Sequence, residues 1–207
     1  MNDRTADNLN DRTPDLAQDE HRTKGAALLI IDMIGTFEHD DGEKLFRNTK
    51  PSAEKIAALK KRAAELKIPV VFVNDNYGEW RNDFHATLEA ARASEFGSQI
   101  LELINVGPED YHVLKPQRSG FFSTPLEVLL ASLKVSTVII TGIATDICVL
   151  FTANDAYMRG YHVIVPRDCT AAVTHERVLS TLELLERVSD ADTTASDQLD
   201  LEKVQLL

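Results

Sequence analysis

The sequence of 207 residues has only two cysteines, Cys148 and Cys169, and this scarcity argues against a disulfide framework. A reducing cytoplasm is therefore the compartment that we expect for the chain. Its longest apolar runs are far shorter than the roughly 20 residues that a membrane-spanning helix needs. The first 24 residues contain no apolar segment of signal-peptide length, so we expect neither export nor membrane insertion.

Positive charge is also scarce. The chain has 22 Lys and Arg against 33 Asp and Glu, which gives a formal net charge of -11 and a pI near 5.0. Nucleic acids and anionic membranes both reward clustered Lys and Arg, so neither is expected as a partner. Small molecules and other proteins remain as candidates.

The apolar content is sufficient for one domain with a sizeable core, at 43% apolar and 27% charged residues. Residues 1–24 are polar and charged throughout, and this composition is typical of a flexible N-terminal tail. We therefore predict one folded domain over residues 25–200, followed by a C-terminal tail over residues 201–207. The sequence contains no internal repeat and no low-complexity segment.

Strand-like apolar segments alternate with helical periodicity from Ala26 onward, which is typical of βα units on a parallel sheet. The expected strands are Ala26–Ile31, Val70–Val73, Tyr111–Leu114, Thr137–Thr141 and Tyr161–Val165, with a polar edge strand over Ala191–Ala195. The expected helices are Ala53–Leu66 capped by Ser52, Asp83–Ile104 interrupted near Gly97, Leu126–Leu133 after Thr124 and Pro125, Cys148–Met158, and Glu176–Val188. The strands lack clean in/out alternation, so we predict helices on both faces in a doubly wound, three-layer α/β/α sandwich.

Polar residues follow the predicted strands at the sheet edge where open parallel sheets bind ligands. They are Asp32, Asn74, Asp75, Lys115, the turn from Gly142 to Cys148, and Arg167 with Asp168. This set supplies an acid, a base and a nucleophile at one edge without any appeal to homology.

Cys148 is the candidate nucleophile, because it lies on a predicted strand-turn-helix junction. The free N–H groups and the positive end of the helix dipole are expected there to favour thiolate over thiol. Asp32 can take the thiol proton and return it to a leaving amine, and Lys115 can stabilise the thiolate. The backbone N–H groups of Ala144 and Cys148 are the expected oxyanion hole. Each residue alone has a structural explanation, but together they predict a catalytic site.

Substrate contacts are predicted from two groups of residues near the same edge. Asn74, Asn76 and Arg81 belong to a dense polar loop, and Phe37, Trp80 and Phe121 are aromatics that either line the pocket or pack in the core. The histidines show no metal-ligand spacing and Cys169 has no recognisable partner, so we predict no metal site, no cofactor and a structural role for Cys169.

Three segments in order resemble the isochorismatase-like cysteine hydrolase superfamily, which includes nicotinamidases and N-carbamoylsarcosine amidase. They are L-L-I-I-D-M-I-G-T-F (Leu28 to Phe37), L-K-P-Q-R-S-G-F-F (Leu114 to Phe122) and G-I-A-T-D-I-C-V (Gly142 to Val149). The resemblance extends from Ala26 to about Asp197. It implies a six-stranded, mainly parallel sheet, a catalytic triad of Asp32, Lys115 and Cys148, a cis peptide between Ile143 and Ala144, and a homodimer or homotetramer.

The chain departs from the family pattern at two positions. Ile34 stands where the family often has Gln, which predicts a more apolar pocket, and Tyr77 stands where nicotinamidases have a metal-binding His. The resulting prediction is a metal-independent amidohydrolase that cleaves a C–N bond of a small carboxamide or a carbamoyl or ureido compound through a Cys148 thioester.

Several alternatives to this activity remain. The fold could serve a non-catalytic binding or scaffold protein, or an enol-ether hydrolase of the isochorismate type, although isochorismatases proper generally lack the cysteine. A haloacid-dehalogenase-type phosphohydrolase is disfavoured, because Ile34 replaces the second Asp of its motif. A dinucleotide-binding protein is disfavoured by the absence of G-x-G-x-x-G after the first strand.

Overall fold

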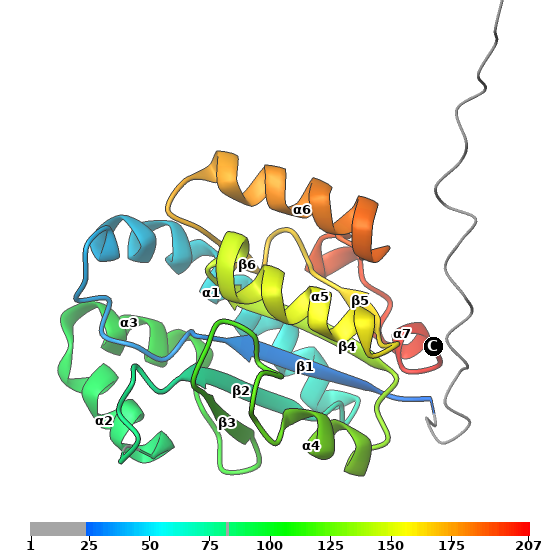
Figure 1. The fold of residues 1–207 in the computed structure, drawn as a ribbon, viewed down its shortest axis with the longest axis horizontal. Coiled ribbons are helices and arrows are strands. Elements are labelled where there is room, and N and C mark those ends of the chain that lie inside the picture. The colour runs from blue at the N-terminus through cyan, green and yellow to red at the C-terminus, as the bar shows by residue number, and fades with distance from the viewer. Residues whose placement is uncertain (1–23, 82) are drawn as a thin grey trace, which may run out of the picture.

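The computed structural model describes residues 24–81 and 83–207. Apart from Lys24, the predicted N-terminal tail lies outside the described residues. Figure 1 shows a central sheet with helices in front of it and behind it. This is the three-layer α/β/α architecture that the alternating sequence pattern predicts.

The sheet has six parallel strands in the order β3-β2-β1-β4-β5, and β6 pairs with the carboxyl end of β4. Five of them match the predicted strands to within two residues. The strands are β1 (Ala26–Ile31), β2 (Val70–Asp75), β3 (Tyr111–Lys115), β4 (Thr137–Ile143), β5 (His162–Ile164) and β6 (Thr170–Ala171). The chain passes from β1 outward to β3 and then crosses to the other side of β1 with β4, so the strand order reverses between β1 and β4.

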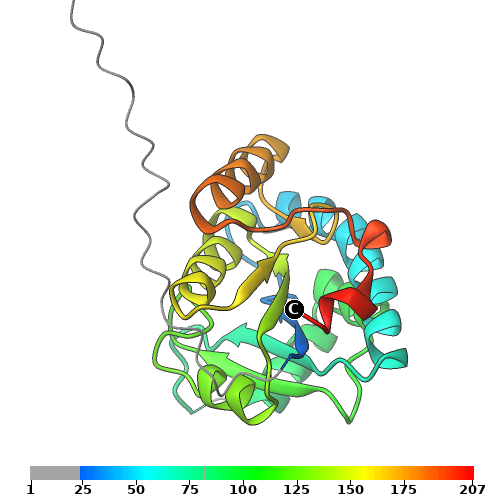
Figure 2. The same ribbon diagram turned by 90° about the vertical axis from the view of Figure 1, so that its right-hand side faces the viewer.

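Helices cover both faces of this sheet, as the edge-on view of Figure 2 shows. Leu28 and Ile30 of β1 face one core, whereas Leu29 and Ile31 face the other, because successive strand residues point to opposite sides. The first core is shared with α1 (Gly42–Glu65), α2 (Phe84–Ala93), α3 (Glu95–Ile104) and α7 (Leu201–Val204). The second is shared with α4 (Leu126–Ser132), α5 (Leu150–Met158) and α6 (His175–Ser189). Burial on both faces explains why the strands read as continuous apolar runs.

The helix predicted to start at Ala53 is longer than expected, because α1 begins at Gly42. Ser52 does not cap it, and its hydroxyl donates instead to the Thr170 carbonyl at 3.1 Å. Pro51 lies inside the helix, where proline normally costs about 3 kcal/mol. Burial of Leu45 and Phe46 in the first core opposes this cost. The early start is thus a tertiary effect that local propensity does not reveal.

The interruption predicted near Gly97 lies three residues earlier, at Ser94. Ser94 is extended and its hydroxyl accepts the Gly97 N–H at 3.2 Å, so it caps α3 while α2 ends at Ala93. A serine cap at this position satisfies a free amide that a continuous helix would not expose.

Two predictions for the C-terminal part are wrong. Ala191–Ala195 forms only an isolated bridge between Asp192 and Ile164, and the sixth strand is β6. The expected tail over residues 201–207 begins with α7, whose Leu201 and Val204 are buried in or against the domain. Burial of these two side chains explains why the segment is ordered.

Gly142 of β4 leaves no room for a side chain, so replacing it with alanine is expected to destabilise the protein by roughly 2–4 kcal/mol. Its φ is +104°, and a Cβ there would lie 2.1 Å from the Ile31 carbonyl oxygen of β1. Urea unfolding would measure the loss. Gly78→Ala is the matched control, because Gly78 also has positive φ but an added Cβ would meet nothing within 4 Å. Equal losses in both variants would contradict the close contact.

Candidate active site

The reversal of strand order between β1 and β4 creates the edge at which the predicted catalytic residues meet. Asp32 directly follows β1, Lys115 is the last residue of β3, and Cys148 lies five residues beyond β4. Strands that are not consecutive in the chain thus bring these side chains to one place.

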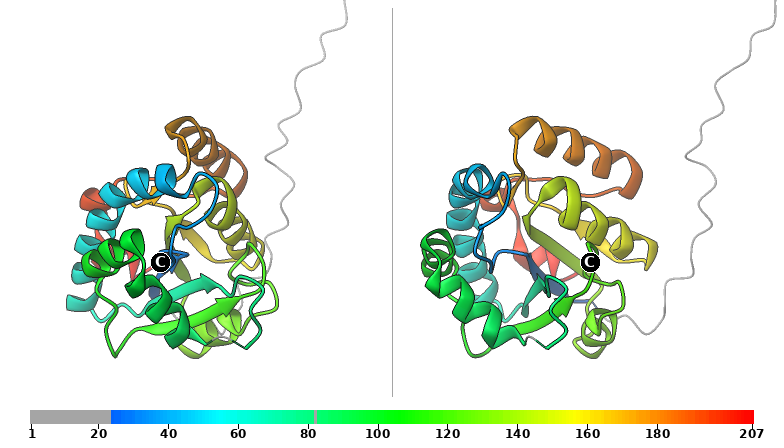
Figure 3. Two further views of the ribbon diagram at one scale, coloured as in Figure 1. Left: turned by 90° about the vertical axis from the view of Figure 1, so that its left-hand side faces the viewer. Right: turned by 60° about the vertical axis from the view of Figure 1, so that its left-hand side comes forward.

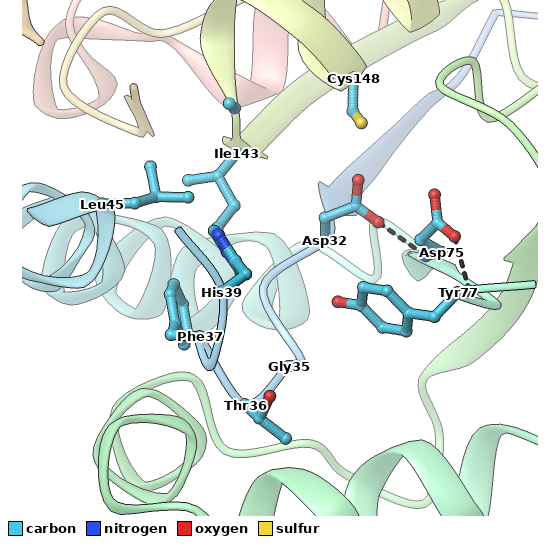
Figure 4. Close-up of a pocket in the computed structure, with 11 residues that line it drawn as sticks. Asp32, Gly35, Thr36, Phe37, His39, Leu45, Asp75, Tyr77, Ile143 and Cys148 are labelled. Atoms are coloured by element: carbon cyan, nitrogen blue, oxygen red, sulfur yellow. Dashed lines mark hydrogen bonds between the residues drawn. The ribbon is translucent and has the colours of Figure 1, made fainter. Parts of the chain in front are cut away.

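Lys115 is the centre of the cluster. Its Nζ lies 2.9 Å from Asp32 Oδ2, 3.2 Å from Asp75 Oδ2 and 3.5 Å from Cys148 Sγ. The Lys115 side chain is completely buried, and Asp75 is its partner in the β2-β3 register. In Figure 4 the Cys148 sulfur points toward the carboxylates of Asp32 and Asp75. The three predicted residues therefore meet, and Asp75 joins them as a second carboxylate.

Backbone contacts hold Asp32 at this position. Asp32 adopts a left-handed conformation with φ 51°, and its Oδ1 accepts the Asp75 N–H at 2.7 Å. The buried Asn74 side chain donates to the Ile34 carbonyl at 2.7 Å and so ties the loop after β1 to the end of β2. Hydrogen bonds of this kind leave the second Asp32 oxygen directed to Lys115.

Cys148 lies in a single π-helical turn, Thr145–Val149, that runs directly into α5. The Ala144 carbonyl accepts the N–H groups of Ile147 and Val149, which closes the turn. The peptide bond between Ile143 and Ala144 is cis, the form that the family resemblance implies. Helical turns of the π type are frequent at functional sites.

The electrostatics of Cys148 correct one prediction. Burial and the neighbouring Asp32 charge raise the pKa of Cys148 to about 12, and the Lys115 charge offsets only part of this effect. The expectation that the helix end would favour thiolate is therefore wrong for the free site, because desolvation and a nearby anion outweigh the positive groups.

The pKa values of the two partners of the thiol, Asp32 and Lys115, are also shifted. Burial raises the pKa of Asp32, although Lys115, Cys148 and the Asp75 N–H act in the opposite direction. Burial alone would lower the pKa of Lys115, but Asp32, Cys148 and Asp75 together raise it. The site therefore combines three groups: the Cys148 thiol, the Asp32 carboxyl group with its raised pKa, and the positively charged Lys115 ammonium.

A pocket of about 210 Å³ opens in front of the thiol. Eleven residues line it, namely Asp32, Gly35, Thr36, Phe37, His39, Leu45, Asp75, Tyr77, Ile143, Ala144 and Cys148. Tyr77 is 62% exposed as a whole residue, but its hydroxyl end is buried close to Gly35 at the pocket. Burial and the charges of Asp32 and Asp75 raise the pKa of Tyr77, so its hydroxyl stays protonated and can donate a hydrogen bond.

Of the six predicted substrate contacts, only Phe37 lines this pocket. Asn74 is fully buried beside it, and the Asn76 side chain accepts the Gly78 N–H within its own turn. Trp80 and Arg81 are exposed outside the lining. Phe121 packs in the second core, at 5.9 Å between its ring centroid and that of Tyr161. Neighbouring positions in sequence do not decide which side of a turn faces the cavity.

Several lining residues were missed because their signal is tertiary. Asp75 was recognised at a strand end, but its contact with Lys115 depends on the β2-β3 register. His39, one of the histidines without metal-ligand spacing, is exposed, yet it lies at the pocket. Ile34, expected to make the pocket more apolar, is instead fully buried in the first core. Arg167 and Asp168 lie in a different cavity, between α1 and α6.

The donor atoms of the described residues do not suit a tightly held metal. No group of three or more His, Cys, Asp or Glu side chains is arranged to hold an ion in residues 24–81 and 83–207. Tyr77 occupies the position at which the resemblance would require a ligand histidine, and zinc sites of proteins are built from imidazole, thiolate and carboxylate. No helix within those same ranges is long and apolar enough to cross a bilayer.

Alkylation of Cys148 by iodoacetamide is expected to be slow at neutral pH and to accelerate as the pH rises toward 12. Asp32→Asn should accelerate it, because removal of the neighbouring negative charge lowers the thiol pKa. Mass spectrometry of the labelled peptide measures the rate. Cys169 is the internal control, since its thiol is buried and its pKa is also raised to about 12 but it lies outside the pocket. Rapid labelling of the unmodified protein at neutral pH would contradict the raised pKa.

The chain is similar to known proteins over most of its length. The Isochorismatase domain family model matches residues 26–196. The chain is 41% identical over 173 residues to the uncharacterized isochorismatase family protein YaaI of Bacillus subtilis, covering 84% of this chain and 95% of that protein. It is 29% identical to Nicotinamidase 3 of Arabidopsis thaliana over 77% of this chain and 80% of that protein. The crystal structure of N-carbamoylsarcosine amidase from Thermoplasma acidophilum superposes with a TM-score of 0.63 at 28% identity, covering 85% and 99% of the two chains.

Proposed function

Since the chain belongs to the isochorismatase family, we propose that it is a cysteine hydrolase that cleaves the C–N bond of a small amide through a Cys148 thioester. One observation carries the proposal: the Lys115 ammonium lies within 3.5 Å of the sulfur and 2.9 Å of the Asp32 carboxylate. A nucleophile, a proton acceptor and a fixed positive charge are thereby in mutual reach. The family relatives that act on amides support the same chemistry.

Acylation begins with the thiol. Asp32 takes the Cys148 proton while the sulfur attacks the carbonyl carbon, which forms the C–S bond and places negative charge on the carbonyl oxygen. The raised pKa of Asp32 suits a group that must first accept a proton and then donate it. The N–H groups of Ala144 and Cys148 are the proposed donors to the oxyanion.

Collapse of the tetrahedral intermediate completes acylation, and attack of water then deacylates the enzyme. Asp32 returns the proton to the nitrogen, the C–N bond breaks, and ammonia or an amine leaves. Water then attacks the thioester with Asp32 as base, and cleavage of the C–S bond releases the acid and restores the thiol. Lys115 keeps its charge throughout and stabilises Asp32 and the thiolate in turn.

The charge around the nucleophile favours a substrate without a carboxylate. Asp32 and Asp75 both face the pocket, the one buried ammonium is shared between them, and none of the described lining residues is Lys or Arg. Phe37, Leu45 and Ile143 supply apolar walls, and the Tyr77 hydroxyl supplies a donor. We therefore propose a small uncharged amide with an apolar acyl group in preference to a carbamoyl or ureido acid.

Asp75→Asn is expected to shift the ratio of kcat/KM for a carboxylate-bearing amide to that for its neutral analogue by about tenfold toward the acid. The reason is the loss of one negative charge beside the carbonyl site, and the ratio cancels any general loss of rate. Steady-state ammonia release measures both substrates. Glu79→Gln on the exposed part of the same loop should leave the ratio unchanged. An unchanged ratio in Asp75→Asn would contradict charge selection by Asp75.

An ammonia-release screen of the purified protein tests the proposed function itself. Neutral primary amides, ureido acids and carbamoyl compounds are compared, with Cys148→Ala protein as the control. Turnover that disappears in the control supports the proposal. A protein that binds these compounds without turnover would instead be the non-catalytic alternative. The cytoplasmic location and the homodimer or homotetramer stay predictions.

A further inference from the structure

A second cavity lies between α1, the segment around β6 and the start of α6. Its volume is about 380 Å³, larger than that of the pocket in front of Cys148, and the two share no lining residue. It is lined by Arg47, Asn48, Pro51, Ser52, Lys55, Arg167, Asp168, Thr170, Ala171, Ala172, His175 and Val178. In both views of Figure 3 the blue-to-cyan helix α1 and the orange helix α6 lie near each other at the top of the molecule, and both helices contact β6. The reaction proposed above uses none of these residues.

The cavity is basic in a chain that is strongly acidic overall. Arg47, Lys55 and Arg167 carry permanent positive charges, against a net charge of -11 for the whole protein. Lys55 and Arg167 form no ion pair with any residue of the described ranges. Unpaired cations that share one concave surface create a local positive potential.

Asp168, the one acidic residue of this lining, is hydrogen-bonded to Ser196. Asp168 accepts the Ser196 N–H at 2.7 Å and the Ser196 hydroxyl at 2.8 Å, one on each carboxylate oxygen. Arg47 contacts Glu43 on the preceding turn of α1, but that pair is exposed to solvent and therefore weak. With three cations against one carboxylate, the lining keeps a net positive charge.

Two features prepare the cavity for an anion. The first is α6, a 15-residue helix that starts at His175 on the cavity wall and directs the positive end of its dipole there. The second is rigidity of the walls, because Asn48 donates to the carbonyls of Ala172 and Val173 and Ser52 donates to that of Thr170. Groups held in place before binding lose little entropy on binding.

We propose that this cavity binds a small polyanion, with Arg47, Lys55 and Arg167 as its charged contacts. Phosphate esters and polycarboxylates share the required chemistry, namely two or more anionic oxygens within reach of guanidinium and ammonium groups. The site is independent of the amide hydrolysis proposed for the Cys148 pocket.

Isothermal titration calorimetry at low ionic strength tests the site, with inorganic pyrophosphate as the phosphate probe and citrate as the polycarboxylate probe. Binding of either probe to the full chain is expected, and Lys55→Gln and Arg167→Gln are each expected to weaken it by about tenfold. Arg92→Gln is the matched control, because Arg92 is an exposed cation on α2 outside the cavity. It should leave the affinity unchanged.

The titrations distinguish the two ligand classes from each other, and they also show whether the proposed site exists. Tighter binding of pyrophosphate identifies phosphate esters, and tighter binding of citrate identifies polycarboxylates. Absence of binding for both probes overturns the site, as does an equal loss of affinity in Arg92→Gln. Lys55 and Arg167 are exposed, so their variants should keep the melting temperature of the parent protein, which confirms that any loss is local.

Discussion

Cys148→Ala is expected to lower kcat/KM for the best amide substrate by about 10⁴-fold or more, while the far-UV circular dichroism and the melting temperature stay close to those of the parent protein. The sulfur forms the covalent bond in the proposed reaction, so no neighbouring group can replace it. Asp32 could at most activate water in the enlarged pocket. The half-buried position of Cys148 means that loss of the thiol leaves little unfilled core.

Cys169→Ala is the matched control for this experiment. Cys169 is fully buried in the first core and does not line the pocket. Its alanine variant should therefore keep turnover even if it loses some stability. Retention of activity in Cys148→Ala, with the product verified by mass spectrometry, would exclude the thioester route.

Lys115→Met is expected to have the largest effect on stability, with a loss of about 3–5 kcal/mol at neutral pH. The variant removes a fully buried ammonium and leaves the carboxylates of Asp32 and Asp75 beside each other without a counter-charge. Activity should fall as well, since Asp32 and the thiolate lose the same charge. Urea unfolding measures the loss, and Lys50→Met on the exposed face of α1 should change stability little.

The pH dependence of this variant has a defined sign. Without Lys115, burial raises the pKa of Asp32 further above its ordinary value of 3.8. A carboxyl group whose pKa is raised in the folded state stabilises the fold below its unfolded pKa, and this contribution is lost as the pH rises through the folded pKa. The stability deficit of Lys115→Met should therefore shrink as the pH falls toward 4.

A double variant tests whether uncompensated charge is the cause. Asp32→Asn together with Lys115→Met should be more stable at neutral pH than Lys115→Met alone, because one of the two carboxylates is removed. A deficit that is independent of pH and of Asp32 would indicate lost packing of the lysine stem instead.

Local signals in the sequence predicted the strands well but some helix boundaries poorly. The runs from Ala26 and Thr137 are apolar enough to specify central strands by themselves. The start of α1 at Gly42 could not be predicted in this way, because Pro51 argues locally for a break and only burial of Leu45 and Phe46 overrides it. The end of α2 at Ala93 depended on Ser94 acting as a cap, which competes with the weaker signal of Gly97.

The sequence by itself determined that an acid, a lysine and a cysteine lie at or just beyond the ends of three strands whose carboxyl ends share one edge, and this order predicts the chemistry of the site. It also determined that the fold has helices on both faces, since uninterrupted apolar strands require cover on each side. Both conclusions depend only on the types of residues and on their order along the chain, so both can be reached without coordinates.

Only the tertiary structure decided how the site is charged and what surrounds it. Whether Cys148 rests as thiol or thiolate depends on burial and on the distances to Asp32 and Lys115, and burial reversed the expectation drawn from the helix end alone. The pairing of Asp75 with Lys115, the exclusion of Phe121 from the pocket and the basic cavity between α1 and α6 depend likewise on strand register and packing. Such properties arise from residues far apart in the chain, and electrostatic interaction depends on separation in space rather than in sequence.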